Sequence, residues 1–408
     1  MRKIIAMYRQ EQLAEIIDMQ TADFVQKSRG IERDILGHIP FVDNFATIIT
    51  GIRRCGKSTV LLQLMKRNEL KAIYFNWEDI RLAGFETDDF TRLHKEIVRR
   101  KIKTLFFDEI QLVPNWEMFI HQLLREGYKV FITGSNASLL SQELGTHLTG
   151  RHLSTELFPF SYPEFCRLKE LSFNPDSLSL FMQTGGLPDY AKTGEKNILQ
   201  NLINDILIRD IAVRYSLKDI ESLKKLTAYL LTNIACPASA NKLTETIGLK
   251  SATTILEYFS HLKNAYVLDF ISQFSYSAKV QLRNPKKVYA IDIGLVNTVA
   301  STFSNNDGRK LENLVFLHLR AKGDELYYFK EKGECDFVVK HEGTIKEAVQ
   351  VCYRINDENS NREFNGLLAA INFFNLNEGS IVTFEQEDEF NYEGKKIKLV
   401  PAHVYLQS

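Results

Sequence analysis

The sequence predicts an α/β fold in which helices cover both faces of a parallel sheet, followed by further helical and mixed domains. A glycine-rich loop with the spacing G-x-x-x-x-G-K-S joins an apolar run at 45–50 to a helical pattern that begins at Val60. Short apolar runs then alternate with helical segments, at 72–76, 104–109, 130–135 and 153–157. This alternation is typical of a parallel sheet.

The glycine-rich loop is a candidate phosphate-binding site. Its residues are Gly51, Ile52, Arg53, Arg54, Cys55, Gly56, Lys57, Ser58 and Thr59. A triphosphate carries dense charge, so the loop must turn backbone N–H groups inward and needs glycine where a side chain would block the approach. Lys57 can reach the β- and γ-phosphates, and Ser58 can ligate Mg²⁺ beside the positive end of the next helix. The predicted cofactors are ATP and Mg²⁺.

Polar residues end two of the predicted strands. Asp108 and Glu109 follow an apolar strand, where Asp108 would hold the Mg²⁺ shell and Glu109 would polarise the attacking water. Ser135 and Asn136 close the next strand, where a polar side chain could hold that water or sense the γ-phosphate, although Asn136 would serve equally well as a helix N-cap. In a parallel sheet these residues share the carboxyl edge, where ligands bind.

Composition limits the partners and the location. The 51 basic and 51 acidic residues balance, so any surface for nucleic acid must be a local patch. The five cysteines are scattered without a C-x-x-C pair, which favours a reducing compartment and no structural zinc. No apolar stretch approaches membrane-spanning length, so we expect a cytoplasmic protein without a membrane partner.

The remaining chain divides by pattern. Residues 1–44 predict a helical lead-in, 45–160 the sheet-containing core, and 161–217 a helical lid or connector. Between 218 and 288, three short helices and a hairpin, Tyr266–Phe274 to Val280–Leu282, predict a winged helix-turn-helix. Such a module binds DNA or docks a protein.

The predicted hairpin carries the basic residues of that module. Four of them surround its second strand: Lys279, Arg283, Lys286 and Lys287. They could contact DNA phosphates without reading bases, while the third helix offers little positive charge for base contacts. The prediction is therefore binding to the DNA backbone, with protein docking as the alternative.

The last segment, 289–408, has the pattern of a second α/β domain. Glu312, Glu334-Cys335-Asp336 and Gln350-Val351-Cys352 resemble the core of restriction-endonuclease-like domains. The resemblance implies a metal between Glu312 and Asp336. Gln350 stands in place of the second carboxylate and Cys352 in place of the lysine, so we expect a vestigial site kept for DNA binding or assembly, with Lys340 or Lys346 as spatial substitutes for the lysine.

Together these motifs resemble a prokaryotic AAA+-type ATPase family with a C-terminal domain of unknown function. The resemblance rests on the loop with Arg53-Arg54, on Asp108-Glu109, Ser135-Asn136 and Gly150-Arg151, and on the segments 158–165 and Gly185-Gly186-Leu187-Pro188. It covers essentially the whole chain. It implies ATP hydrolysis with Arg151 as an arginine finger, and hence a ring or other homo-oligomer.

We therefore expect an ATPase that binds DNA and remodels branched or recombining DNA. Arg53 and Arg54 contact either phosphates or a neighbouring subunit. Two alternatives remain: a nucleotide-controlled signalling or assembly switch whose winged helix docks a protein, and an ATP-gated nuclease that uses Asp336.

Overall fold

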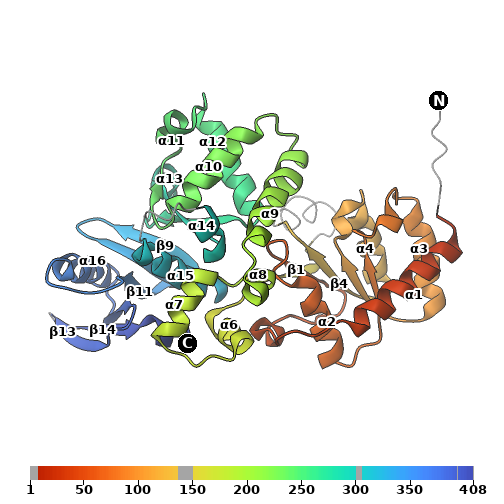
Figure 1. Ribbon diagram of the computed structural model, residues 1–408, viewed down its shortest axis with the longest axis horizontal. Coiled ribbons are helices and arrows are strands. Elements are labelled where there is room, and N and C mark those ends of the chain that lie inside the picture. The colour runs from red at the N-terminus through yellow and green to blue at the C-terminus, as the bar shows by residue number, and fades with distance from the viewer. Residues whose placement is uncertain (1–7, 137–149, 300–305, 393, 408) are drawn as a thin grey trace. The chain divides into compact units, whose positions relative to one another are not determined.

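The computed structural model describes residues 8–136, 150–299, 306–392 and 394–407 (Figure 1). The chain forms two compact units, Met1–Leu157 and Phe158–Ser408. The predicted lid or connector, 161–217, lies in the second unit. No described helix combines the length and apolar character needed to cross a bilayer.

The first unit contains a parallel sheet. Its described elements are α1 (Gln10–Gln26), η1 (Asp34–Gly37), β1 (Ala46–Thr50), α2 (Lys57–Arg67), β2 (Ala72–Asn76), η2 (Ile80–Leu82), α3 (Asp89–Arg100), β3 (Thr104–Asp108), η3 (Ile110–Leu112), α4 (Trp116–Arg125), β4 (Lys129–Gly134) and β5 (His152–Glu156). The described strands lie in the order β2-β3-β4-β1-β5, and every neighbouring pair is parallel. The predicted strands are confirmed, each within one residue at either end.

The lead-in helix α1 packs on this sheet beside β2. Leu13, Ile16 and Ile17 are buried, as an apolar stripe at helical spacing requires. Phe24 extends the contact, since its ring stacks on Tyr74 of β2 with centroids 3.9 Å apart. The lead-in is thus part of the core of the first unit.

The second unit combines helices with a long sheet. Its described elements are α6 (Tyr162–Lys169), α7 (Pro175–Thr184), α8 (Pro188–Thr193), α9 (Asn197–Asp205), η5 (Ile206–Val213), α10 (Ile220–Thr232), β6 (Pro237–Ala238), α11 (Ala240–Ile247), α12 (Ala252–Asn264), β7 (Leu268–Gln273), α13 (Ala278–Arg283), β8 (Lys286–Ala290), α14 (Ile293–Val299), α15 (Asp307–Ala321), β9 (Glu325–Lys330), β10 (Glu334–His341), β11 (Thr344–Val351), α16 (Ser360–Phe373), β12 (Glu378–Thr383), β13 (Asp388–Tyr392), β14 (Lys395–Pro401) and α17 (Ala402–Tyr405). The described strands follow the order β13-β14-β12-β11-β10-β9-β7-β8-β6.

This order corrects the hairpin predicted between 266 and 282. The strand that returns beside β7 is β8, Lys286–Ala290, and the predicted strand Val280–Leu282 lies within the short helix α13. Val280 and Leu282 are exposed, so their alternation does not mark a strand with a buried face. Because β7 also pairs with β9, the segments predicted as separate domains share one sheet.

Helices α15 and α16 cover opposite faces of the sheet. Val338 on β10 packs in a cluster with Leu367 and Ile371 of α16. The preceding residue, Phe337, instead faces Phe316 of α15. Since successive side chains of a strand point to opposite faces, β10 and its neighbours are enclosed between the two helices.

Candidate functional site: a phosphate loop and a buried acidic cluster

The phosphate loop follows β1 at the carboxyl end of the sheet. Gly51 has φ of 150°, and a Cβ added there would lie 2.2 Å from the Leu157 carbonyl oxygen, so a side chain cannot be accommodated. Lys57 begins α2, and its Nζ donates to the carbonyl oxygens of Gly51 (3.0 Å) and Ile52 (3.1 Å). Both acceptors are neutral, so a phosphate would be a stronger partner for this ammonium.

Asp108 ends β3 and receives donors from three other elements. Its Oδ2 accepts hydrogen bonds from the hydroxyls of Ser58 and Tyr74, both at 2.6 Å, and its Oδ1 accepts one from Thr133. Asp108 is 4% exposed. Because all three donors are neutral, they orient the carboxylate and leave its negative charge in place. The sequence predicted Ser58 and Asp108 together; Tyr74 and Thr133 are additions from the structure.

Glu109 lies beside this carboxylate in a left-handed backbone conformation, with φ of 56°. Its N–H donates to the Thr133 carbonyl oxygen at 3.2 Å, and its side chain accepts from Gln111. Burial raises the pKa of Glu109 to about 7, with Lys57 opposing the shift and Asp108 adding to it. A carboxyl group with this pKa can accept a proton near neutral pH.

Two residues that the sequence did not predict, Arg33 and Gln63, stabilise the phosphate loop and the helix that follows it. Arg33, 6% exposed, donates from Nη1 to the Cys55 carbonyl oxygen at 2.9 Å. Gln63 of α2 donates to the carbonyl oxygens of Arg29 (2.7 Å) and Ile31 (2.6 Å). The lead-in is thereby fastened to both the loop and its helix. No local spacing in the sequence links Arg33 or Gln63 to their acceptors, so the sequence carried no signal for these contacts.

The other predicted residues of the first unit lie apart from these groups or at their edge. Ser135 and Asn136 are buried just beyond β4, at the same sheet edge as Asp108. Arg53 forms an ion pair with Glu78 at 3.1 Å, which gives it a partner within the chain. Arg151 is exposed and precedes β5, beside the start of β1, so it lies at the amino edge of the sheet. A five-residue strand, about 16 Å, separates the two edges.

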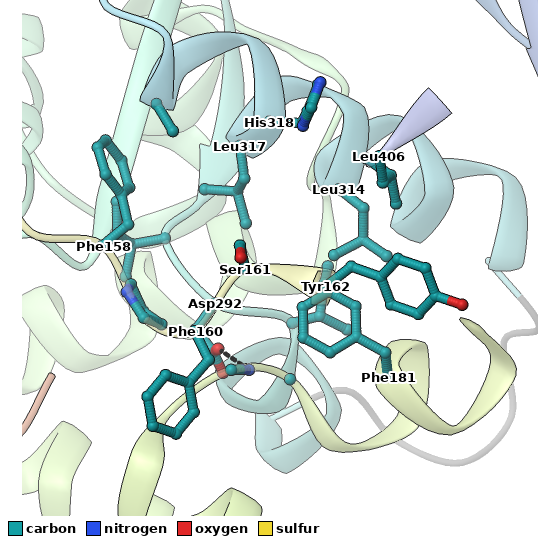
Figure 2. A pocket seen from close by; sticks show the side chains of 16 residues that line it. Phe158, Phe160, Ser161, Tyr162, Phe181, Asp292, Leu314, Leu317, His318 and Leu406 are labelled. Carbon is teal, nitrogen blue, oxygen red and sulfur yellow. Dashed lines mark hydrogen bonds between the residues drawn. The ribbon is translucent and has the colours of Figure 1, made fainter. Parts of the chain in front are cut away.

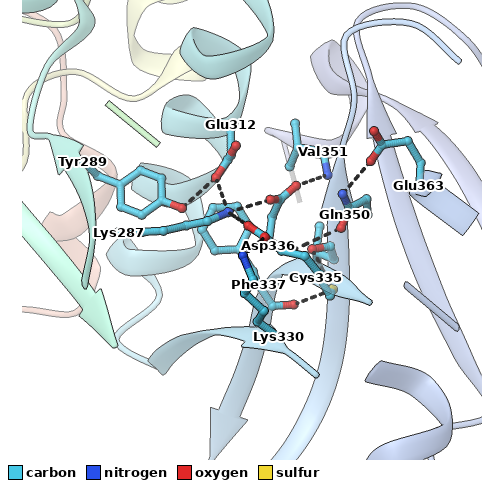
Figure 3. A network of polar contacts seen from close by, with 12 residues as sticks. Lys287, Tyr289, Glu312, Lys330, Cys335, Asp336, Phe337, Gln350, Val351 and Glu363 are labelled. Carbon is cyan, nitrogen blue, oxygen red and sulfur yellow. Dashed lines mark hydrogen bonds and ion pairs between the residues drawn. The ribbon is translucent and has the colours of Figure 1, made fainter. Parts of the chain in front are cut away.

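The second unit contains an acidic cluster, which we call the Asp336 cluster. Its buried members are Lys287, Tyr289, Glu312, Asp336 and Gln350 (Figure 3). Glu334, with a side chain that is 39% exposed, lies at its margin and pairs with Lys287. The cluster brings together all three residues predicted as a vestigial nuclease site. It also corrects two predictions. Lys287 is 2% exposed and belongs to this cluster rather than to a DNA-binding surface. Lys340, a predicted substitute for the missing lysine, instead pairs with Glu325 at 3.0 Å.

Electrostatics in the cluster are dominated by burial and mutual attraction. Burial opposes the charge of Lys287, but Asp336 and Glu312 attract it and raise its pKa well above the usual value. Burial also raises the pKa of Glu312, and the nearby Asp336 adds to the shift. Lys287 therefore stays charged at neutral pH and offsets part of the negative charge of the carboxylates around it.

The Gly185-Gly186-Leu187-Pro188 segment lies beside an apolar pocket of about 90 Å³ (Figure 2). A Cβ on Gly186 would lie 2.1 Å from the Phe160 carbonyl oxygen, which explains the glycine. Asp292 accepts from the N–H groups of Gly186 (2.6 Å) and Gly294 (2.8 Å). The Asp292 side chain thus stabilises the turn at Gly186. The rest of the pocket lining is mainly aromatic and aliphatic, with Phe158 and Leu314 as examples.

Comparison with known proteins places these features in a family. Residues 43–166 match the model of an AAA domain, and residues 176–306 match a domain of unknown function, DUF8612. An uncharacterized protein of Methanocaldococcus jannaschii, MJ1544, is 34% identical over 413 residues, which cover 95% of this chain and 92% of that protein. The chain belongs to its family. An uncharacterized protein of Haemophilus influenzae is 30% identical over 340 residues, covering 78% of this chain and 85% of its own.

Solved structures overlap only loosely with the whole chain. One is ORC1 of Aeropyrum pernix in a complex with DNA. The match covers 71% of this chain and 90% of the ORC1 chain, at 14% identity and a TM-score of 0.29. Another is RuvB of Thermotoga maritima, a Holliday junction branch migration motor. The match covers 64% of this chain and 87% of the RuvB chain, at 15% identity and a TM-score of 0.29. The AAA domain therefore rests on the family model and on the phosphate loop within its sheet.

Proposed function

We propose that the protein hydrolyses ATP at the phosphate loop and couples this to DNA held by its second unit. The observation that supports hydrolysis best is the joint placement of Lys57, Ser58, Asp108 and Glu109 at one edge of the parallel sheet. Lys57 supplies positive charge for the phosphates, and Ser58 and Asp108 supply adjoining oxygens. Neutral donors surround Asp108, which fits a site that receives a cation with the nucleotide.

Each residue then has a defined role. Ser58 and Asp108 would hold Mg²⁺, which neutralises charge on the phosphates when bound. Glu109 accepts a proton from the attacking water, for which a pKa near 7 is suited. Tyr74 and Thr133 fix the orientation of the Asp108 carboxylate. Gly51, Ile52, Arg53, Arg54, Cys55, Gly56 and Thr59 complete the loop, with Ser135 at its margin.

Arg151 supports an oligomeric arrangement. It is exposed at the amino edge of the sheet, away from the loop of its own chain. An arginine there can stabilise the developing charge only at the site of a second copy. We therefore propose that hydrolysis needs a homo-oligomer, in which Arg151 acts on the neighbouring site.

The DNA part of the proposal rests on the exposed basic residues around α13. Lys279 and Arg283 are exposed and Lys286 is partly exposed. Helix α12 instead presents Leu256 and Glu257 to solvent, and a carboxylate there would repel phosphates. This charge distribution favours contacts between the side chains around α13 and the DNA backbone, without readout of the bases.

The test is ATP turnover by the full chain, alone and with single-stranded, duplex and four-way-junction DNA, at two salt concentrations. We expect Lys57→Ala to abolish turnover, because the phosphates lose their ammonium partner. We expect DNA to raise wild-type turnover less at the higher salt, because phosphate contacts release counterions. A triple alanine variant of Lys279, Arg283 and Lys286 should keep basal turnover and lose the stimulation.

The matched control removes three exposed lysines elsewhere in the second unit: Lys192, Lys196 and Lys218. It should respond to DNA as the wild type does. If no DNA changes turnover at either salt, the DNA part is wrong while the ATPase part stands. If the wild type hydrolyses no ATP, or if Lys57→Ala hydrolyses it normally, the proposal of hydrolysis at the phosphate loop is wrong.

One observation favours a second candidate, a nucleotide-controlled switch that docks a protein. A groove between α12 and α13 is lined by apolar side chains such as Leu256, 52% exposed, and Leu282, 77% exposed, together with polar and basic residues that include Arg283 and Lys286. Exposed apolar side chains at a groove are typical of protein contacts. Slow turnover that no DNA alters, together with a change in turnover on adding a protein partner, would favour this candidate.

A further inference from the structure

The Asp336 cluster contains a cation that belongs to the chain itself. The Lys287 ammonium lies 2.8 Å from Asp336 Oδ1, 3.3 Å from Glu312 Oε1 and 3.3 Å from Glu334 Oε1 (Figure 3). Its side chain is 3% exposed. A charge buried this deeply needs partners, and three carboxylates around one ammonium supply them.

The geometry follows from strand alternation. Lys287 and Tyr289 are two residues apart on β8, so they point to the same face of the sheet. The Tyr289 hydroxyl donates to the same Glu312 oxygen at 2.7 Å, and its ring stacks on Phe316 of α15 at 4.2 Å. The ammonium is therefore held in place by the packing of its own strand.

Other polar atoms of Glu334, Asp336 and Gln350 are also engaged, and Glu334 Oε2 pairs with Lys330 at 3.0 Å. Asp336 Oδ2 accepts from the Val351 N–H at 3.0 Å. The Gln350 side chain accepts from the Asp336 N–H at 3.1 Å and donates to Glu363 at 2.6 Å. These contacts hold Gln350 in a structural hydrogen-bond chain.

These observations disagree with the divalent metal that the resemblance to restriction-endonuclease-like domains implies. A metal bound between Glu312 and Asp336 would take up oxygens that the ammonium already contacts, and would lie beside a like charge in a buried site. The residues present therefore do not fit the metal. Lys287 contacts all three carboxylates, and a second ammonium, Lys330, pairs with the partly exposed Glu334 at 3.0 Å.

We propose that Lys287 is the resident cation of this cluster, that it takes the place of a divalent metal, and that the cluster is thereby closed to metal-dependent chemistry. The inference is independent of the proposed ATPase. It predicts that loss of the ammonium alone opens a divalent-cation site formed by Glu312, Glu334 and Asp336.

The test compares Mn²⁺ binding by nucleotide-free wild type, Lys287→Met and Lys286→Met, using titration calorimetry and thermal unfolding. Lys286→Met is the matched control, because it removes one lysine charge from the same strand and leaves the cluster intact. We expect Lys287→Met to gain one Mn²⁺ site, at least about tenfold tighter than any binding by the wild type, and Mn²⁺ to raise its unfolding temperature. The double variant Lys287→Met/Asp336→Asn should lose the added site.

Two results of the binding experiment would overturn the inference. One is a wild-type Mn²⁺ site that disappears in Asp336→Asn, since the cluster would then already hold metal. The other is a folded Lys287→Met that gains no Mn²⁺ site. If Lys287→Met does not fold, Lys287→Gln replaces it, and the comparison of wild type with Asp336→Asn stands by itself. Cutting of supercoiled DNA by wild type with Mn²⁺ that is lost in Asp336→Ala would likewise refute the inference.

Discussion

The protein contains two buried aspartates, Asp108 at the end of β3 and Asp336 near the start of β10, and their partners differ in charge. Asp108 accepts hydrogen bonds from three neutral hydroxyls, which fix the orientation of its carboxylate without neutralising the negative charge. Asp336 accepts from a lysine ammonium at 2.8 Å and a backbone N–H at 3.0 Å. The first arrangement suits a site that awaits a cation, and the second suits a site that already has one.

The largest expected effect concerns the group beside the Asp108 carboxylate. Glu109→Gln should lower kcat by about 10²- to 10⁴-fold, because an amide cannot accept the proton of the attacking water. Nucleotide binding should persist, since Lys57 and the loop are unchanged. Phosphate release and equilibrium binding of a fluorescent ATP analogue measure the two effects. Wild-type turnover in Glu109→Gln would show that another residue is the base.

The second prediction compares the loss of stability on substituting each of the two aspartates. Asp336→Asn should lower the free energy of unfolding by about 3 kcal/mol or more, because the buried ammonium loses its nearest carboxylate and the new NH₂ can face the Val351 N–H. Asp108→Asn should lower it by less, because its hydroxyl partners are neutral and can accept as well as donate.

Unfolding in urea can separate the two units. Both tryptophans, Trp77 and Trp116, are buried in the first unit, so their fluorescence follows Asp108→Asn. Hydrogen exchange of peptides from β10 and β11 follows Asp336→Asn. Equal costs for the two substitutions would contradict the distinction between the clusters.

The same contrast shows what the sequence could and could not predict. The loop spacing and the strand that ends at Asp108 are local signals, so the Ser58–Asp108 pair was predictable. Tyr74 lies one strand away and Arg33 lies 22 residues before its acceptor, Cys55, so no spacing rule connects them with the loop. Contacts of this kind depend on tertiary packing.

Lys287 illustrates a different failure. In the sequence Lys287 lies near Lys279, Arg283 and Lys286, so it was predicted to contact DNA phosphates together with them. Its alternation with Tyr289 on β8 was the available signal, because it places both side chains on one face. That signal needed the correct strand boundaries, and the apolar residues Val280 and Leu282 had pointed to the wrong strand.

A smaller effect is expected for Tyr74→Phe, which removes one of the neutral donors to Asp108. A hydrogen bond to a charged acceptor contributes about 1.5–3 kcal/mol, so tryptophan fluorescence should show a loss of stability in that range. Ring stacking on Phe24 is retained. Turnover should fall less than in Glu109→Gln, because Ser58 and Thr133 still orient the carboxylate. A fall as large as that of Glu109→Gln would assign Tyr74 a direct part in the reaction.

The smallest expected effect is the pH dependence set by Glu109. Its pKa of about 7 lies above the usual 4.5, so kcat/KM should be lost as pH falls through 7 and be about tenfold lower at pH 6 than at pH 8. The folded state also holds this proton between about pH 4.5 and 7 while the unfolded state has released it, so the contribution of Glu109 to stability falls as pH rises across that window. Glu109→Gln should remove both trends. If it removes only the stability trend, Glu109 is a buried carboxyl group without a part in proton transfer.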